Sequence, residues 1–339
     1  MSQIAVLKNI VAPGHSRVDI PVAQIASGYP LKLTAHVIRG AQDGPTMVIT
    51  GVMHGDEFGS IPVLLDFIKD LDPAHIKGAI VILPVANPLA LGALSRFTPD
   101  VHGNTDLHAV FPGSPGGTLT QKMAAAINTN LIQGLTPDDL FVDIHSGGAG
   151  GRLQFRVDYD NQLAGALKER VVDLCRAYGT RLIHENNLAG TSSRVANSLG
   201  VPTINVEVGG SFLDEPSCAS FTERGVRGLR AVAAMIGVLD GERPAHKEQW
   251  VYDTVNRIEV NPQVGGYLIS YKPAMEDLDH LITEGTLLGE VVDPHSLEVV
   301  DRLVAPVDGF LFFTRRSGIV EAGGKVFGLA RASGSLCLR

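Results

Sequence analysis

The stretch TMVITGVMHGDE, residues 46–57, joins a run of β-branched and apolar residues to a histidine and two carboxylates. Residues 46–50 form a short and nearly continuous run of the kind found in strands that are covered on both faces. We expect a helix to begin near residue 57. Polar residues between such a strand and a helix lie at the carboxyl end of the strand, where open α/β sheets bind their ligands.

Three more runs of this kind follow, and helix-like stretches separate them. The expected strands lie at residues 79–83, 140–144 and 203–206, and the expected helices lie near 57–70, 118–133, 161–178 and 217–238. Strands that alternate with helices of this length indicate an α/β domain. We therefore predict a mixed, largely parallel sheet flanked by helices over residues 1–240.

The two ends of the chain have a different pattern. Residues 1–40 alternate apolar and polar positions and are expected to add antiparallel strands at 18–22 and 31–38. Residues 241–244 are typical of a linker. The part beyond it contains short strand-like segments at 285–293, 304–311 and 321–326, punctuated by Gly, Pro and Asp. We predict a small all-β domain over residues 241–339.

Composition excludes several classes of partner. The formal net charge of −8 argues against a nucleic-acid partner, because neutralising phosphates requires clustered Lys and Arg. No apolar stretch reaches the ~20 residues that span a bilayer, so we expect no membrane segment. The first residues lack a secretory signal. The three cysteines show no metal-like spacing and are expected to be reduced thiols, which favours the cytoplasm.

The pattern His-x-x-Glu occurs twice, and the context separates the two copies. His54 and Glu57 follow the buried strand, so both could reach one ion at the strand end. The alternative is an ordinary helix start, where Asp56 and Glu57 favour the helix dipole. His295 and Glu298 lie among polar residues of the small β domain and are expected to be a solvated surface pair.

Two further strand ends carry ionisable residues beside glycines. Asp143 and His145 are two apart, so they face the same side of a strand and the carboxylate could orient the imidazole. Glu207 ends the last strand and is followed by Gly209 and Gly210, which suggests a cleft. The structural alternatives are a satisfied histidine at a strand end and a glutamate paired with a nearby arginine.

Two His and one Glu can hold a zinc ion in three of its four tetrahedral positions, which leaves the fourth open for water. A second Glu could take a proton from that water. These are the minimum parts of a metal-dependent hydrolase. Similar nitrogen and oxygen sites bind several divalent ions, so the residue types leave the identity of the ion open.

The ordered set of motifs resembles the succinylglutamate desuccinylase/aspartoacylase family of the zinc carboxypeptidase superfamily. The motifs that carry the resemblance are His54–Glu57, Arg96, Asp106–Gly113, Asp143–Gly148, Glu207–Gly210 and, in the tail, Ala305–Gly309. The resemblance implies a zinc-carboxypeptidase-like fold.

The resemblance also assigns roles to individual residues. It implies one Zn²⁺ per chain, with His54, Glu57 and His145 as its ligands. It implies that Glu207 is the general base and acid, and that Arg96 polarises the scissile carbonyl. In this family the small β domain narrows the cleft to small substrates.

One motif departs from the family pattern. The family usually reads Asp-Leu-Asn-Arg-x-Phe-Pro-Gly, and its Asn-Arg pair grips a substrate carboxylate, whereas this chain has His108 and Ala109 at those positions. Losing a charge-assisted contact of this kind costs on the order of 1.5–3 kcal/mol unless another group replaces it. His108 keeps a donor, and Arg194 and Arg152 are candidate replacements.

We therefore expect hydrolysis of a linear amide bond in a small N-acylated amino acid or related metabolite. Two alternatives stay open: a metallocarboxypeptidase that acts on short peptides, and a zinc-binding descendant that has lost turnover. The sequence also leaves room for a homo-oligomer.

Overall fold

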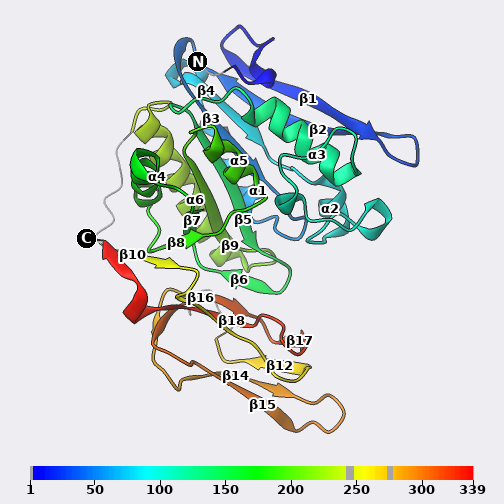
Figure 1. The fold of residues 1–339 in the computed structure, drawn as a ribbon, viewed down its shortest axis with the longest axis vertical. Helices are drawn as coiled ribbons and strands as arrows, with labels where there is room; N and C mark the ends of the chain where they lie inside the picture. The colour runs from blue at the N-terminus through cyan, green and yellow to red at the C-terminus, as the bar shows by residue number, and fades with distance from the viewer. Residues whose placement is uncertain (1–2, 242–247, 273–277, 339) are drawn as a thin grey trace.

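The computed structural model describes residues 3–241, 248–272 and 278–338. Ten of the described strands form one large twisted sheet (Figure 1). In spatial order they are β1 (Gly14–Gln24), β2 (Pro30–Arg39), β4 (Lys77–Leu83), β3 (Gln42–Gly51), β5 (Leu140–Gly147), β9 (Thr203–Gly210), β7 (Arg156–Asp160), β8 (Leu182–Asn186), β10 (Gln249–Asp253) and β19 (Leu336–Leu338).

The centre of this sheet is parallel and its first edge is antiparallel. β3 pairs in parallel with β4 and with β5, and β5 pairs in parallel with β9. β1 pairs antiparallel with β2, as residues 18–22 and 31–38 predict. β7 runs antiparallel to β9 but parallel to β8. The prediction of a mixed, largely parallel sheet flanked by helices is confirmed.

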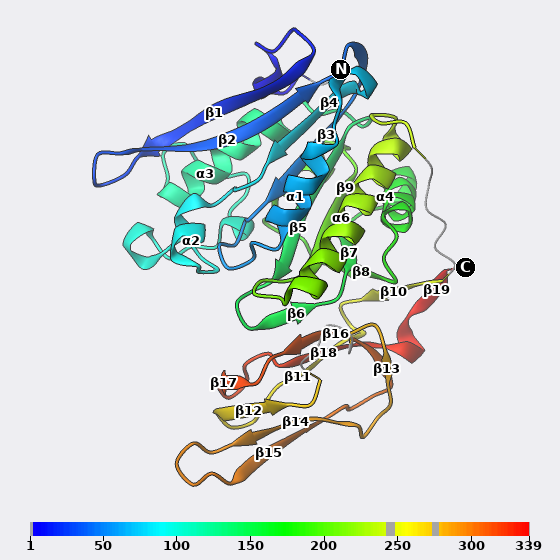
Figure 2. The same cartoon turned by 180° about the vertical axis from the view of Figure 1, so that it is seen from behind.

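Helices cover both faces of the sheet (Figures 1 and 2). They are α1 (Ser60–Lys69), α2 (Pro88–Ala93), α3 (Leu119–Ile127), α4 (Gly165–Tyr178), α5 (Ser192–Ser198) and α6 (Glu215–Ile236). Apolar side chains of α1, α4 and α6 form one buried core with the sheet. Side chains of α3, α5 and the π-helical turn Asn128–Ile132 form the second core on the opposite face.

Local signals explain where the longest helix begins and ends. Asp214 caps the first turn of α6 by accepting a hydrogen bond from the backbone N–H of Ser217. Gly237 ends the helix in the left-handed conformation, with φ of +83°. None of the helices in the described ranges is both long and apolar enough to cross a membrane.

Two smaller antiparallel sheets lie beyond the carboxyl end of the central strands (Figure 2). One contains β11 (Arg257–Val260), β18 (Phe327–Arg331), β16 (Gly309–Arg315) and β13 (Leu281–Ile282), with β6 (Gly151–Leu153) paired to β16. The other contains β15 (Val299–Val304), β14 (Leu287–Val292), β12 (Gly266–Ser270) and β17 (Gly318–Val320).

The C-terminal third of the chain adds two strands to one edge of the large sheet. β10 pairs in parallel with β8, and β19 pairs with β10. Aromatic and aliphatic side chains from both parts are buried together, among them Leu182, Tyr252 and Phe312. The small sheets are therefore inserted between two strands of the main sheet.

Two expected strands in this region differ from the structure. The segment 304–311 is divided by a turn at 305–308, so β15 ends before it and β16 begins after it. Residues 321–326 form a loop that leads into β18, with Gly323 in the left-handed region at φ of +73°. Most of the expected linker, 242–244, lies outside the described residues.

Candidate metal centre and active site

The turn between β3 and α1 supplies two of the predicted ligands. Glu57 precedes the helix, and its backbone N–H donates to the carbonyl of His54 at 3.2 Å, which closes the turn. Gly55 packs against the backbone of α2, where a Cβ atom would lie 1.9 Å from the carbonyl carbon of Ala90. The turn brings Nδ1 of His54 to 3.1 Å from Oε1 of Glu57.

The third predicted ligand lies on the neighbouring strand β5. Nδ1 of His145 is 3.0 Å from Oε2 of Glu57, and its Nε2 is 3.2 Å from the buried carboxylate of Asp143. Thr50 donates a second hydrogen bond to Asp143, at 2.7 Å. Asp143 therefore orients the imidazole of His145 so that Nδ1 faces Glu57, as the two-residue spacing predicts.

The structure brings His54, Glu57 and His145 into one buried cluster. One ligand atom from each lies within 4.8 Å of the others. Nδ1 of His54 is buried, and its 3.1 Å contact with Glu57 lacks the geometry of a hydrogen bond. Burial by itself raises the pKa of Glu57, but the adjacent His54 and His145 hold it well below its usual range. Two imidazole nitrogens around an ionised carboxylate fit a zinc ion.

His108 extends this cluster from the short 3₁₀ turn Leu107–Ala109. Its Nε2 lies 3.6 Å from Asp143, and its ring centroid lies 4.5 Å from that of His145. Donor atoms of His108, Asp143 and His145 also lie within 4.8 Å of one another. Burial and the nearby His145 lower the pKa of His108 to about 3, so its imidazole is neutral at physiological pH.

Glu207 lies on β9 directly opposite His145 of β5 in the parallel register. Its Oε1 is 3.5 Å from Nη2 of Arg156, and its buried Oε2 has no hydrogen-bond partner among the described residues. Burial raises the pKa of Glu207, and Arg156 only partly offsets this effect. A carboxylate with a raised pKa and a free oxygen suits proton transfer near neutral pH.

Arg96 reaches the cluster from the loop after α2. Its Nη1 lies 2.5 Å from Oε1 of Glu57, so it pairs with the same carboxylate as the two histidines. The side chain is 49% exposed, in contrast to the buried cluster. The structure therefore places Arg96 at the boundary between the candidate metal centre and the pocket.

A pocket of about 510 Å³ opens over these residues. His54, Glu57, Arg96, His108, His145 and Glu207 all line it. Ala109 lines it as well. The C-terminal part of the chain contributes Arg257 of β11, Phe313 of β16 and Lys325 of the loop before β18 to its wall.

Two of the expected substrate contacts are not brought to this pocket. Neither Arg194 nor Arg152 is among the described residues that line it. Arg194 pairs with Asp160 through its Nε and, at 2.7 Å, through Nη2, so its fork is already occupied.

Other residues of the pocket were missed by sequence reasoning. Arg156 and Asp158 are two apart on β7 and are joined by a 2.7 Å hydrogen bond. Their alternating positions are a signal for one face of a strand, but the strand is so polar that no apolar run marks it. Lys325 carries no such signal, because only tertiary structure brings its loop to the pocket.

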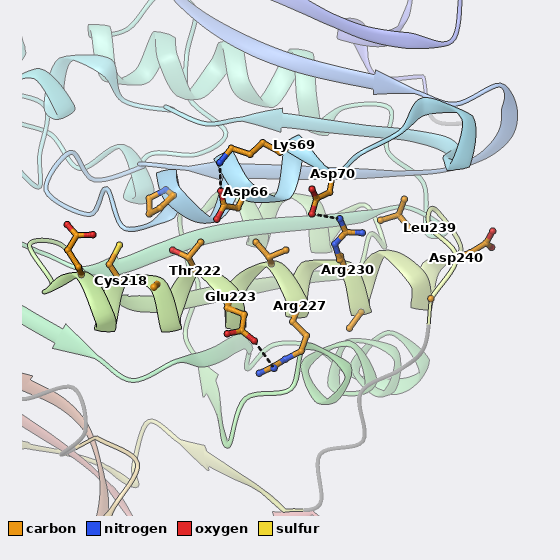
Figure 3. Close-up of a pocket in the computed structure, with 16 residues that line it drawn as sticks. Asp66, Lys69, Asp70, Cys218, Thr222, Glu223, Arg227, Arg230, Leu239 and Asp240 are labelled. Atoms are coloured by element: carbon orange, nitrogen blue, oxygen red, sulfur yellow. Dashed lines mark hydrogen bonds and ion pairs between the residues drawn. The ribbon is translucent and has the colours of Figure 1, made fainter.

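A larger groove, of about 1250 Å³, lies between α1 and α6 (Figure 3). Figure 3 shows several of its charged side chains paired with one another, for example Lys69 with Asp66 and Arg230 with Asp70. None of the predicted site residues lines this groove. The candidate centre therefore lies at the smaller pocket and not at this groove.

Comparison with known proteins gives consistent matches. The family model described as the succinylglutamate desuccinylase/aspartoacylase catalytic domain matches residues 43–236. N-alpha-acetyl-L-2,4-diaminobutyric acid deacetylase of Halomonas elongata is 24% identical over 312 residues, which cover 91% of this chain and 86% of that protein.

Solved structures of similar fold cover nearly the whole chain. The succinylglutamate desuccinylase/aspartoacylase structure from Rhodobacter sphaeroides has a TM-score of 0.82 at 20% identity and covers 97% of this chain and 99% of its own. The product-bound ectoine utilization protein EutE (DoeB) from Ruegeria pomeroyi has a TM-score of 0.82 at 22% identity, with 95% and 97% covered.

Proposed function

The chain belongs to the succinylglutamate desuccinylase/aspartoacylase family, and from that premise we propose that it is a zinc-dependent deacylase that hydrolyses the amide bond of a small N-acylated amino acid. The observation that carries the proposal is the buried cluster of His54, Glu57 and His145 with Glu207 beside it in one pocket. The relative named as a deacetylase of an N-acetylated diamino acid supports this substrate class.

The residues of the pocket have different roles in the proposed reaction. A zinc ion held by His54, Glu57 and His145 would supply Lewis acidity, which polarises an acyl oxygen and makes water more acidic. Glu207 takes a proton from the attacking water and passes it to the leaving amine. Its free Oε2 supports this role.

Arg96 also has a role in the proposed reaction. Arg96 pairs with Oε1 of Glu57, and its half-exposed side chain lies at the edge of the pocket. There it stabilises the negative charge that develops on the acyl oxygen.

The size of the pocket favours a small substrate over a peptide. About 510 Å³ suits a metabolite-sized ligand, and the C-terminal sheets form part of the wall. Comparing cleavage of N-acyl amino acids with cleavage of dipeptides separates the deacylase from a carboxypeptidase. Binding of N-acyl amino acids without turnover would instead indicate a non-catalytic descendant.

The test combines metal analysis with a substrate panel. We expect inductively coupled plasma mass spectrometry to find about one zinc per chain. We also expect the protein to hydrolyse at least one N-acetyl amino acid. Glu207→Gln should keep its zinc and lose about 10²–10⁴-fold in rate, because proton transfer is removed. A protein that binds no divalent ion, or a zinc-loaded protein inert on the whole panel, contradicts the proposal. Full activity of Glu207→Gln contradicts the assignment of the base alone.

A further inference from the structure

Three cationic side chains surround the ring of Phe312 on the side of the pocket built by the C-terminal sheets. The Cζ atoms of Arg156 and Arg257 lie 5.1 and 5.7 Å from the ring centroid, and Nζ of Lys325 lies 5.5 Å from it. All three cations line the pocket that contains Glu207. So much positive charge at one wall requires anions to balance it.

The carboxylates of the protein satisfy two of these cations much better than the third. Arg156 donates to Asp158 through Nε at 2.7 Å and through Nη2 at 3.2 Å. Arg257 donates to Glu259 at 2.8 Å. Lys325 has only an ion pair to Glu259 at 3.8 Å, which is longer than a hydrogen bond.

Two donors at this wall therefore have unused capacity within the described residues. No hydrogen bond to Nζ of Lys325 is formed there, and Nη1 of Arg156 is buried without a partner. Arg156 is only 4% exposed, so this orphaned donor carries a full desolvation cost.

The surroundings of Lys325 disfavour an unaccompanied charge. Its side chain is 30% exposed, and Nζ lies 4.2 Å from the centroid of Phe313. Burial and the neighbouring Arg257 lower the pKa of Lys325 to about 7. An anion bound between Lys325 and Arg156 would stabilise the charged amine and satisfy the orphaned donor together.

We propose that Lys325, with Nη1 of Arg156, binds the carboxylate of the amino-acid half of the substrate, an inference that rests on the proposed deacylase function. Arg156 also contacts Glu207, the residue that would protonate the leaving amine. In an N-acyl amino acid the α-carboxylate lies two bonds from the amide nitrogen. A carboxylate at this wall therefore places the scissile bond next to Glu207.

This subsite would take the role of the Asn-Arg pair that the family has where this chain has His108 and Ala109. Ala109 lines the same pocket but offers no charge, and Arg194 is held by Asp160. The C-terminal loop brings a replacement cation from a different element of the fold. The substrate carboxylate would thus be bound by cations of β7 and of the loop before β18.

The experiment compares N-acetyl-L-amino acids with their carboxamides, using the zinc-loaded full chain. We expect the wild type to prefer the acids. Lys325→Met keeps the apolar stem but loses the charge, and should lower the acid-to-amide ratio of kcat/KM at least about tenfold. Lys325→Arg should restore most of the ratio. Lys69→Met removes an exposed lysine of α1 and should leave the ratio unchanged.

The pH dependence provides an independent readout. The groups that face Lys325 are Arg156, Arg257, Glu207 and Glu259. An amine is charged below its pKa, so the wild-type ratio should fall as pH rises through about 7. In Lys325→Arg the ratio should stay flat over this range, because a guanidinium remains charged. A flat wild-type profile contradicts the proposal.

The outcomes keep the two proposals separate. An unchanged ratio in Lys325→Met overturns the carboxylate subsite, while hydrolysis by the wild type still supports the deacylase. If the wild type hydrolyses nothing on the panel, calorimetric titration with N-acetyl amino acids decides the subsite. Binding that Lys325→Met weakens at least tenfold upholds it. Equal or absent binding in both proteins overturns it.

Discussion

Asp143 shows how one buried side chain organises the candidate centre at the scale of the residue. Its carboxylate accepts hydrogen bonds from Thr50 at 2.7 Å and from Ser192 at 3.3 Å, and it lies 3.2 Å from Nε2 of His145. A buried carboxylate is tolerated only when such partners satisfy it. Because Asp143 occupies Nε2, Nδ1 of His145 is the nitrogen available to a metal ion.

The two His-x-x-Glu pairs provide a matched test of the metal site. His54→Asn should lose bound zinc, with affinity reduced more than tenfold, since even partners of metal ligands are worth 10–100-fold. His295→Asn changes an exposed residue between β14 and β15 and should keep the wild-type metal content. Plasma mass spectrometry after dialysis measures both. Equal metal content in the two variants, with unchanged circular dichroism, would contradict the site.

The cluster around His54 was accessible from the sequence because its residues follow recognisable strands. The wall of the pocket that carries Arg156, Arg257 and Lys325 could not be predicted from the sequence. Arg194 was a candidate for the substrate carboxylate from the sequence, yet Asp160 occupies its fork. Lys325 lies in what resembled a strand, yet it reaches the pocket only because its segment is a loop next to β18. Local pattern does not encode contacts made between distant loops.

At the scale of the element, continuous apolar runs were the reliable signal and polar strands were not. Leu140–Gly147 is buried along its entire length, and its first five residues predict β5 directly. Arg156–Asp160 is equally buried but consists mainly of charged residues, which form ion pairs with one another or with Arg194. Polar pairing within a sheet replaces the hydrophobic pattern that sequence reasoning detects.

Close packing of α6 gives a prediction at this scale. A Cβ atom on Gly228 would lie 2.6 Å from the ring of the buried Tyr178 on α4. Gly228→Ala should lower the free energy of unfolding by about 1–3 kcal/mol, despite the better helix propensity of Ala. Gly92→Ala in α2 meets nothing within 4 Å and should be neutral or stabilise by up to about 1 kcal/mol. Urea unfolding measures both, and a Gly228→Ala variant as stable as wild type would contradict this packing.

At the scale of the whole molecule, the C-terminal part is both a wall of the pocket and a piece of the main sheet. β10 extends the sheet beside β8, and the ring of Tyr252 stacks on His184 with centroids 4.5 Å apart. The sequence indicated an added β region beyond residue 240. It could not indicate strand pairing between segments about seventy residues apart, because register between distant strands is set by tertiary packing.

A truncated chain tests how far the two parts depend on each other. We expect a chain that ends at residue 240 to lack cooperative unfolding, because β8 loses its neighbour and Leu182 loses its cover. Circular dichroism melting and size-exclusion chromatography measure this. Replacing the exposed residues 294–297 with two glycines is the control and should preserve both profiles. A monodisperse, cooperatively melting truncated chain would show that the sheet is complete without β10.

The late position of Lys325 in the chain has a consequence during synthesis on the ribosome. His54, His145 and Glu207 leave the exit tunnel well before Lys325 does, on the order of ten seconds earlier at common elongation rates. The residues of the candidate metal centre are therefore synthesised well before the wall of the pocket that contains Lys325. The pocket is therefore complete only after nearly the whole chain has left the ribosome.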